Sequence, residues 1–301
     1  MVLLTITDTH IEVWKRLVPF IGNLYGVAGV MGNLYAESGI QPNNLQNSFS
    51  KALGMTDKEY TDAVDAGKYT DFAIDNAGYG IAQWTYPSRK RNMQAAARIL
   101  DRSIGDLDFQ LYFLCRELEN YSVVLNELVS AKSIYNASTA FLTMYEKPAN
   151  LTEQNKQRRA DLSQQFYDAL KDVEVEEPYV HEFYRVLKRG SEGEDVVRLQ
   201  KNLIEFGYNL PHGADGKYGS ETYKAVQTFQ FEHDLHMDGI AGSLTQDLLM
   251  HLLVETHPAG EIDDDEPEQA LYTITISNLE EDVAEALFDQ FEDYPVTLER
   301  E

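Results

Sequence analysis

The sequence has one cysteine among 301 residues, no long apolar run and no basic start. A single cysteine, Cys115, excludes an intramolecular disulfide, and its surroundings, YFLCREL, predict a buried helical position rather than a nucleophile. No stretch approaches the roughly 20 apolar residues that cross a bilayer. The first ten residues, MVLLTITDTH, lack the basic segment and the apolar core of a signal peptide. These absences predict a chain with neither a membrane span nor a signal peptide.

Positive charge is also scarce, and it is scarcest at the end of the chain. The formal net charge is −25, and residues 261–301 contain fifteen Asp and Glu residues against Arg300 alone. So acidic a chain is repelled by phosphate backbones and by anionic lipid surfaces. We therefore expect neither nucleic acid nor a membrane among its partners.

The apolar content and the length together predict several packed domains. Hydrophobic residues make up 43% of the chain, which is sufficient for folded cores, and 301 residues suit two or three domains. Residues 9–171 are mostly of helical pattern, with 41–50 and 76–88 expected as loops or short strands. Thr9 with Glu12, and Thr56 with Glu59, have the spacing of capping boxes at helix starts. We interpret 1–171 as one helical domain.

The remainder divides at two acidic segments. Residues 172–185 contain Pro178 and show no amphipathic period, so we predict a linker. Residues 186–256 contain D-G-x-x-G-S-x-T twice, at 215–222 and 238–245, a pattern of turns that each precede a helix. This predicts a three-helix bundle. A second acidic linker, 257–270, leads to 271–301, whose pattern predicts a small β-α-β segment that can self-associate into a homo-oligomer or dock onto another domain.

The sharpest candidate for chemistry is Glu37, within NLYAESGIQP. Apolar residues from Val27 to Leu34 recur at helical spacing, and Glu37 falls at the rim of that face. Gly39 is suited to end the helix, so Glu37 lies in the last turn. The negative end of a helix and burial both disfavour a charged carboxylate, and a neutral carboxyl is what a general acid needs. The alternative is a glutamate that simply points into water.

A second stretch, DNAGYGIAQWTYPSRKR, combines glycines with aromatic side chains. Tyr79, Trp84 and Tyr86 have flat faces suited to stacking on sugars, and the Gln83 amide can both donate to and accept from an N-acetyl group. The alternative is an aromatic loop that packs on its own core. Taken alone, this stretch favours the second interpretation.

Together these stretches resemble a known family. AGVMGNLYAESGIQPNN, DNAGYGIAQWTYPSRK and the later STAFLTMYEKP occur in the order seen in the phage tail-type lysozyme family. The resemblance covers roughly residues 20–170 and implies a lysozyme-like, largely helical fold that cleaves the glycan strand of peptidoglycan. It also implies that Glu37, in A-E-S-G, is the general acid, and that Gly78 to Trp84 line the sugar groove.

Residues 187–252 resemble a three-helix peptidoglycan-binding domain. The resemblance rests on Leu199, Gln200, Phe229 and Gln230, and on the glycines of the two repeated turns. It implies that peptidoglycan is the partner. The overall prediction is therefore a mainly α protein with a catalytic domain, a wall-binding bundle and a small C-terminal β-α-β segment.

The second catalytic group is open at this point. A retaining glycosidase needs a second carboxylate about 5–5.5 Å from the acid and an inverting one about 6.5–9.5 Å, whereas a lytic transglycosylase needs none. Asp75 is the first candidate, because it enters the aromatic loop, and Asp71 is weaker. Glu146 has a structural interpretation, as an ion-pair partner of Arg158 or Arg159.

No cofactor and no metal site is expected, since the seven histidines lie outside the central motifs and no H-E-x-x-H occurs. We expect an endolysin-type muramidase, made in the cytoplasm of a phage host and acting on its wall, either after holin-type release or as a virion part. The alternatives are a lytic transglycosylase of the same bond, a non-catalytic wall-binding or tail structural protein, and an endopeptidase. The last would need a zinc ligand set or a Cys/His pair.

Overall fold

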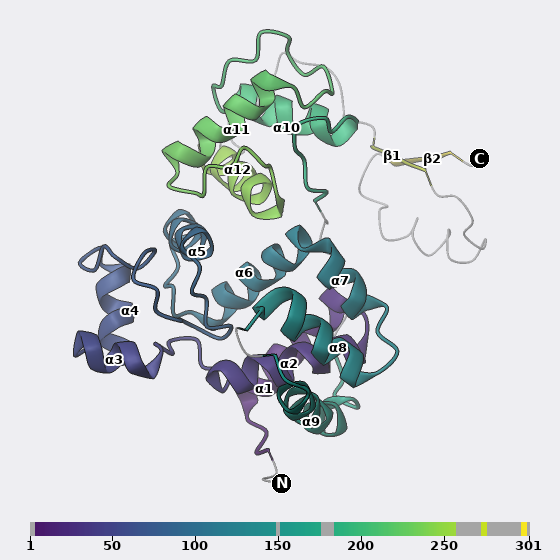
Figure 1. The fold of residues 1–301 in the computed structure, drawn as a ribbon. Coiled ribbons are helices and arrows are strands. Elements are labelled where there is room, and N and C mark those ends of the chain that lie inside the picture. Colours follow the sequence, from purple (N-terminus) through teal and green to yellow (C-terminus); the bar gives the residue numbers. More distant parts are fainter. Residues whose placement is uncertain (1–3, 149–150, 176–183, 257–271, 276–295, 300–301) are drawn as a thin grey trace. The chain divides into compact units, whose positions relative to one another are not determined.

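The computed structural model describes residues 4–148, 151–175, 184–256, 272–275 and 296–299, and helices dominate the described part (Figure 1). This confirms the predicted mainly α class. The helices of the larger region are α1 Asp8–Ile21, α2 Leu24–Ser38, α3 Asn47–Leu53, α4 Asp57–Asp65, α5 Pro87–Ile99, α6 Leu107–Asn120, α7 Ser122–Val129, α8 Ile134–Ala140, the π-helix η1 Phe141–Glu146, α9 Glu153–Leu170, α10 Glu194–Glu205, α11 Ser220–Glu232 and α12 Ser243–Thr256.

Capping side chains set several helix ends. The Thr56 hydroxyl accepts from the Glu59 amide while the Glu59 carboxylate accepts from the Thr56 amide, so the predicted capping box of α4 is confirmed. The prediction for α1 was wrong by two residues, because Thr7 rather than Thr9 is the N-cap. His10 is the N3 residue, and its ring accepts from the Thr7 amide at 3.2 Å. A histidine thus replaces the acid that the sequence pattern favoured.

Helix α2 forms the centre of the larger domain, and its small residues let other helices come close. Its residues from Gly26 to Leu34 are all buried. A Cβ atom built on Gly29 would lie 2.7 Å from the Cβ of Ala137 in α8, and one on Gly32 would lie 2.4 Å from the Ser163 amide nitrogen in α9. Real Cβ atoms do not approach that closely, so glycine is required for this packing. The close approach fixes the end of α2 against α9.

Helices α10, α11 and α12 form the bundle predicted from the repeated turns (Figure 1). Each repeated Asp-Gly turn is held by a buried glutamine of the preceding helix. Gln200 donates to Asp215 at 2.9 Å and accepts from the Gly216 amide at 2.8 Å. Gln230 does the same for Asp238 and Gly239, at 2.9 and 2.8 Å. The sequence repeat is therefore a repeat of one hydrogen-bonding device.

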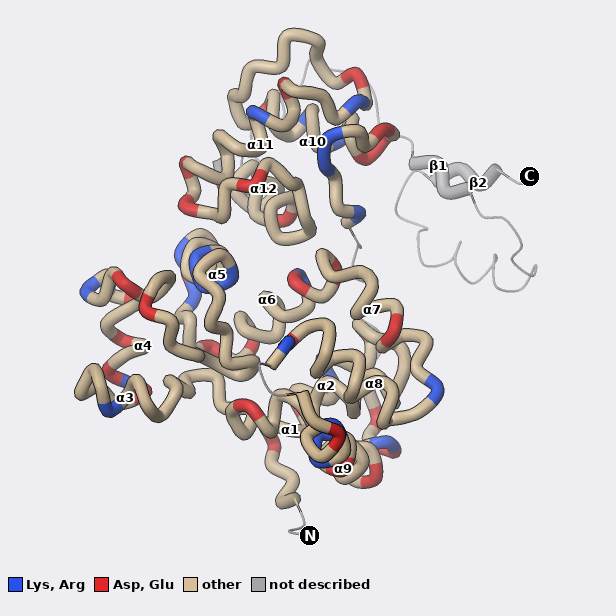
Figure 2. The backbone as a smooth tube through the Cα atoms, in the orientation of Figure 1, with Lys and Arg blue, Asp and Glu red and all other residues tan. Residues whose placement is uncertain are grey.

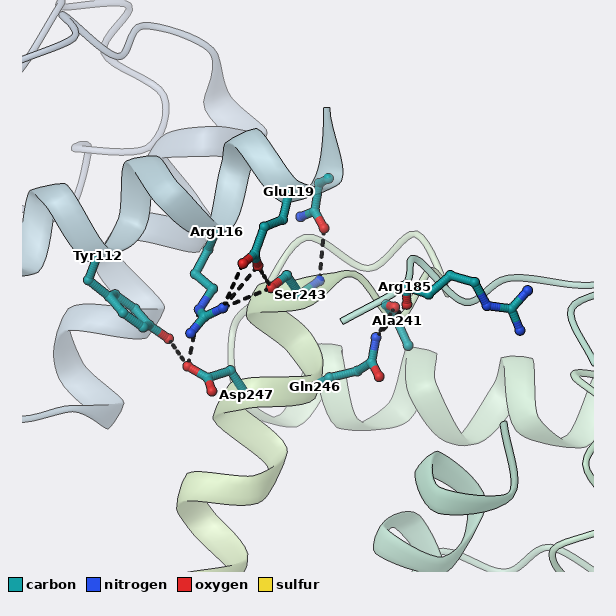
Figure 3. A network of polar contacts seen from close by, with 9 residues as sticks. Tyr112, Arg116, Glu119, Arg185, Ala241, Ser243, Gln246 and Asp247 are labelled. Atoms are coloured by element: carbon teal, nitrogen blue, oxygen red, sulfur yellow. Dashed lines mark hydrogen bonds and ion pairs between the residues drawn. The ribbon is translucent and has the colours of Figure 1, made fainter. Parts of the chain in front are cut away.

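A buried polar network, the α6–α12 network, joins α6 to α12 (Figure 3). The Arg116 Nε lies 3.3 Å from an oxygen of Asp247, and the Tyr112 hydroxyl donates to the same oxygen at 2.6 Å. The Ser243 hydroxyl donates to Glu119, which also pairs with Arg116 at 2.9 Å. These contacts tie the bundle to the domain before it.

Two units follow from the contacts within the chain, Met1–Thr256 and His257–Glu301. In the second unit, strands β1 (Tyr272–Thr275) and β2 (Val296–Glu299) pair in parallel, with Tyr272 opposite Val296. The helix predicted between them lies outside the described residues, so the β-α-β segment and its self-association remain predictions. So do the boundaries proposed for the domains and linkers.

Candidate active site

Glu37 lies in the last turn of α2, as predicted. Gly39 follows with φ +68° and ends the helix in the left-handed conformation. The Glu37 side chain is 26% exposed, which agrees with a rim position. Its Oε1 contacts the Arg159 Nη2 of α9. The sequence did not reveal this contact between a carboxyl group and a guanidinium.

Arg159 connects Glu37 to a second glutamate. Its Nη1 donates to the Asn33 carbonyl at 2.7 Å and lies 3.5 Å from Oε2 of Glu146. Glu146 is the last residue of η1, and Lys147 follows with φ +50°. The predicted pairing of Glu146 with an arginine of α9 is therefore confirmed for Arg159. The structure adds that Glu37 and Glu146 share this one cation.

Glu146 is the more buried of the two glutamates. Its side chain is 6% exposed, and no amide, hydroxyl or cationic group of the described residues donates a hydrogen bond to either oxygen, so the carboxyl group of Glu37 is its hydrogen-bonding neighbour. Burial raises the pKa of Glu146 to about 8; Arg159 offsets part of that rise, and the negative charge of Glu37 adds to it. Burial thus favours the neutral form of Glu146.

Both glutamates line one cavity of about 400 Å³. Volumes of this order accommodate small ligands. Main-chain and side-chain polar groups from four separate segments meet there. The lining residues are Glu37, Gln46, Gly78, Ala82, Gln83, Thr85, Tyr86, Arg89, Glu146 and Pro148.

Two of the predicted sugar-binding residues, Gln83 and Tyr86, reach this cavity. Tyr86 is 57% exposed, so its ring is free to stack. The Gln83 Nε2 donates to the Asn44 carbonyl at 3.0 Å and to the Gly80 carbonyl at 3.1 Å, which fixes the amide. Its Oε1 would lie 2.7 Å from a Cβ on Gly78, so a larger residue at position 78 would displace the amide. The side chain is thus held in one orientation at the cavity.

The other two aromatic residues do not fit the predicted stacking role. Tyr79 and Trp84 are both fully buried, so neither ring offers a face to a ligand. The Tyr79 hydroxyl shares a hydrogen bond with Thr61 at 2.5 Å, and the Trp84 indole donates to Glu117 at 2.7 Å. Their backbones also form a bridge, with the Trp84 amide donating to the Tyr79 carbonyl at 2.9 Å. Both side chains therefore stabilise the loop from its buried side instead of contacting a ligand.

Asp75, predicted as the second acid, is not among the residues that line the Glu37 cavity. One oxygen accepts from Lys90 at 2.5 Å and from the Ala77 amide at 2.9 Å. The other accepts from the hydroxyls of Tyr60 and Tyr69. Lys90 is itself fully buried. Asp75 is thus the counter-ion of a buried lysine, and the structure brings Glu146 rather than Asp75 to Glu37.

Arg89 is a further cavity residue that the sequence analysis missed. Figure 2 shows basic residues gathered along α5, the helix that carries it. Its guanidinium makes two contacts with Glu117, at 2.6 and 2.7 Å, and stacks over Tyr145 at 4.4 Å. The only local sequence pattern that pointed to Arg89 was SRKR after an aromatic loop, and this pattern does not distinguish Arg89 from the basic residues beside it. The pattern at Glu146 is clearer, because this acid lies between an aromatic helix and Lys-Pro.

Cys115 is buried, as predicted, and burial raises the pKa of its thiol to about 12. Across the described ranges, no three His, Cys, Asp or Glu side chains are grouped so that they could hold a metal ion. Among those same residues, no helix has both the length and the apolar character that crossing a membrane requires.

Comparison with known proteins now identifies the class. The phage tail lysozyme family matches residues 8–170, more than half of the chain, and the chain belongs to this family. A peptidoglycan binding domain matches residues 192–249. Both resemblances expected from the sequence are thereby confirmed.

Individual relatives share a much shorter stretch. The N-acetylmuramoyl-L-alanine amidase CwlL of Bacillus licheniformis is 45% identical over 65 residues, which cover 21% of this chain and 18% of that protein. The spore cortex-lytic enzyme of Oceanobacillus iheyensis is 42% identical over 66 residues, which cover 22% of this chain and 24% of that protein. The spore cortex-lytic enzyme of Bacillus subtilis is 42% identical over 67 residues, which cover 22% of each protein. The chain thus spans about a fifth to a quarter of the length of these relatives. No solved structure matches the chain at a significant level.

Proposed function

We propose that this protein is a peptidoglycan hydrolase that cleaves the glycan strand between MurNAc and GlcNAc, with Glu37 as the general acid. The observation that supports this most is the position of Glu37. In a member of the phage tail lysozyme family, it lines a cavity of about 400 Å³ together with Arg89 and a second carboxyl group, that of Glu146. Cleavage of a glycosidic bond needs a proton at the leaving oxygen, and a carboxyl group in such a cavity can supply it.

The substrate is proposed to lie across the Gln83 and Tyr86 side of the cavity. The exposed Tyr86 ring offers an apolar face to a sugar, and the Gln83 amide offers polar contacts to an N-acetyl group. Arg89, held by Glu117, adds a fixed cation at the same wall. Peptidoglycan stems carry carboxylates, which a fixed guanidinium can bind.

The bundle at 192–249 is proposed to hold the enzyme on the wall. Its match to a peptidoglycan binding domain supports this, as does the likeness of a stretch of 65 to 66 residues of the chain to relatives named amidase and cortex-lytic enzyme. Binding through one module raises the local concentration of substrate at the other. Action on the wall of a phage host, after release or from the virion, is part of the same proposal.

Product analysis tests the reaction. Purified peptidoglycan is digested with the wild-type protein, with Glu37→Gln and with Glu127→Gln, and the fragments are identified by mass spectrometry. Glu127 is a suitable control because it is exposed on α7 and does not line the cavity. We expect glycan fragments with reducing MurNAc ends from the wild type and from Glu127→Gln, and almost none from Glu37→Gln.

The same digest separates the alternatives. Anhydro-sugar ends would assign lytic transglycosylation of the same bond instead of hydrolysis. Unchanged glycan together with wall binding would assign the non-catalytic role and would contradict the proposal. Activity of Glu37→Gln equal to that of the wild type would remove Glu37 from the mechanism.

A further inference from the structure

Glu146 is a buried carboxyl group that the proposed reaction has not used. It ends η1, is 6% exposed, and lines the same cavity as Glu37. The nearest cation group, Nη1 of Arg159, lies 3.5 Å from its Oε2, which is beyond good hydrogen-bond distance. An ionised carboxylate so buried without a donor would be costly. A protonated one carries a donor of its own.

The charges around the cavity favour one proton on the pair of glutamates. Arg159 supplies a single positive charge from α9, and its direct contact is with Glu37, while its other nitrogen also serves the Asn33 carbonyl. Arg89 of α5 acts on Glu146 from a greater distance and is already paired with Glu117. Two ionised carboxylates beside one guanidinium would repel each other, so the second is favoured in its neutral form.

We propose that Glu146 is a positioning residue that shares a single proton with Glu37 and so keeps Glu37 supplied with the proton it donates. This rests on the proposed function of Glu37. The direction of the Glu146 pKa agrees, because burial raises it to about 8 while Arg159 only partly offsets the rise. The pair then holds one proton through neutral pH.

The proton balance closes in a full cycle. The pair begins with one proton, which passes from the Glu37 carboxyl to the glycosidic oxygen as its bond to the anomeric carbon breaks. In hydrolysis, water adds to that carbon and returns one proton to the now fully ionised pair. In transglycosylation, the 6-hydroxyl of the muramyl sugar adds instead and returns its proton. Both routes restore the starting state without a further reactant.

The test is the pH dependence of glycan cleavage by wild type, Glu146→Gln and Glu146→Asp. Gln keeps the size of the side chain and cannot hold the shared proton, so we expect about a tenfold or greater loss of rate at pH 8. The alkaline limb of its profile should move to lower pH by about one unit or more. The loss should shrink towards pH 5, where protons from solution are more abundant and the proton held at Glu146 matters less. Asp keeps a carboxyl group and should retain the position of the limb.

Two further measurements, of melting temperature and of the Glu146 carboxyl resonance, test the same inference without catalysis. The folded protein binds a proton at Glu146 that the unfolded chain releases between pH 4.5 and 8, so this group's contribution to stability is lost as pH rises through that range. The melting temperature of Glu146→Gln should therefore fall less than that of the wild type from pH 5 to pH 8. The ¹³C resonance of the Glu146 carboxyl in the wild type should titrate well above the usual range for glutamate.

Two results would overturn the inference. One is a Glu146→Gln profile that is lowered by the same factor at every pH, which is the behaviour of a purely structural residue. The other is a wild-type Glu146 carboxyl that titrates at the ordinary value near 4.5. Glu37→Gln, measured alongside, distinguishes this failure from failure of the proposed function. If it is inactive while Glu146→Gln keeps the alkaline limb, only the role of Glu146 is lost.

Discussion

Two regions of this molecule place an arginine of low exposure between two carboxyl groups, and they differ in what the carboxyl groups contact. In the α6–α12 network, Arg116 faces Glu119 and Asp247, and hydroxyl groups of Ser243 and Tyr112 donate to the same two carboxyl groups. At the cavity, Arg159 faces Glu37 and Glu146, and Glu146 has no hydrogen-bond donor among the described residues.

The comparison shows which observation points to function. Burial raises the pKa of Glu119 to about 7 and that of Glu146 to about 8, so a raised pKa does not separate the two regions. Perturbed acids occur in structural networks as well as in active sites. The difference is that Glu37 and Glu146 line a cavity, and that one of them has spare hydrogen-bonding capacity. An active site needs hydrogen-bonding groups of this kind, which are free to contact the substrate.

The largest expected effect comes from comparing the cleavage rates of two variants, each of which removes one carboxyl group from one of the two regions. Glu37→Gln should lower the rate of glycan cleavage by about 10²- to 10⁴-fold, because the proton donor is lost. Asp247→Asn should leave the rate on short glycan fragments within about twofold of the wild type, since no residue of its network lines the cavity. Release of reducing sugar per folded molecule, with melting temperatures, measures both. Equal losses in rate would remove the distinction between the regions.

A smaller effect is expected from the packing that brings Arg159 to Glu37. Gly32→Ala places a methyl group against the backbone of Ser163, one turn along α9 from Arg159. We expect a loss of about 1–3 kcal/mol in unfolding free energy from overpacking and a rate about tenfold lower, because α9 must shift. Gly29→Ala is the control, since its added methyl group would overlap with α8 rather than with α9. It should destabilise the protein similarly with less loss of rate.

Asp75→Asn should affect stability rather than chemistry. It leaves Lys90 buried without its counter-ion, which costs about 3–5 kcal/mol in unfolding free energy. The rate per folded molecule should stay close to that of the wild type, because Asp75 does not line the cavity. Chemical denaturation and activity on the same samples check this. A stable Asp75→Asn protein without activity would restore Asp75 as a catalytic candidate.

The smallest effect concerns the response of the α6–α12 network to pH. The pKa of Glu119 lies above its ordinary 4.5 in the folded protein, so its contribution to stability is present in acid and is lost as pH rises towards about 7. Glu119→Gln should therefore flatten the decline of melting temperature between pH 5 and 7 by a few degrees at most. The alkaline limb of the cleavage profile should not move. A shift of that limb would mean that the two regions are coupled.

Much of the fold was predictable because its signals are local. The C-terminus of α2 is set by Gly39 and the N-terminus of α4 by the Thr56–Glu59 capping box, and both act within a few residues. The placement of Glu37 in the last turn of α2 follows from the same reasoning. The start of α1 was missed because a histidine at N3 fulfils a role that the pattern reserves for an acid.

The rest of the site depends on packing over long sequence separations. Arg159 lies 122 residues from Glu37, and their contact requires the approach of α9 to Gly32. Tyr79 and Trp84 have the chemistry to bind sugars, but their orientation is decided by partners such as Thr61 and Glu117 on other helices. Sequence reasoning therefore singled out Glu37, Gln83 and Tyr86, which line the cavity, and named Asp75, which does not line it, as the first candidate for a second acid.

The π-helix η1 has a consequence for how the cavity tolerates insertions and deletions. Its wide turn is closed by the Lys147 amide, which donates to the Leu142 carbonyl five residues back at 2.9 Å. An α-helical turn would close one residue earlier, and removing one residue would rotate Glu146 by about 100° around the helix axis. The carboxyl group would then leave the wall of the cavity. The position of Glu146 is therefore set by residue count in this segment as well as by residue identity.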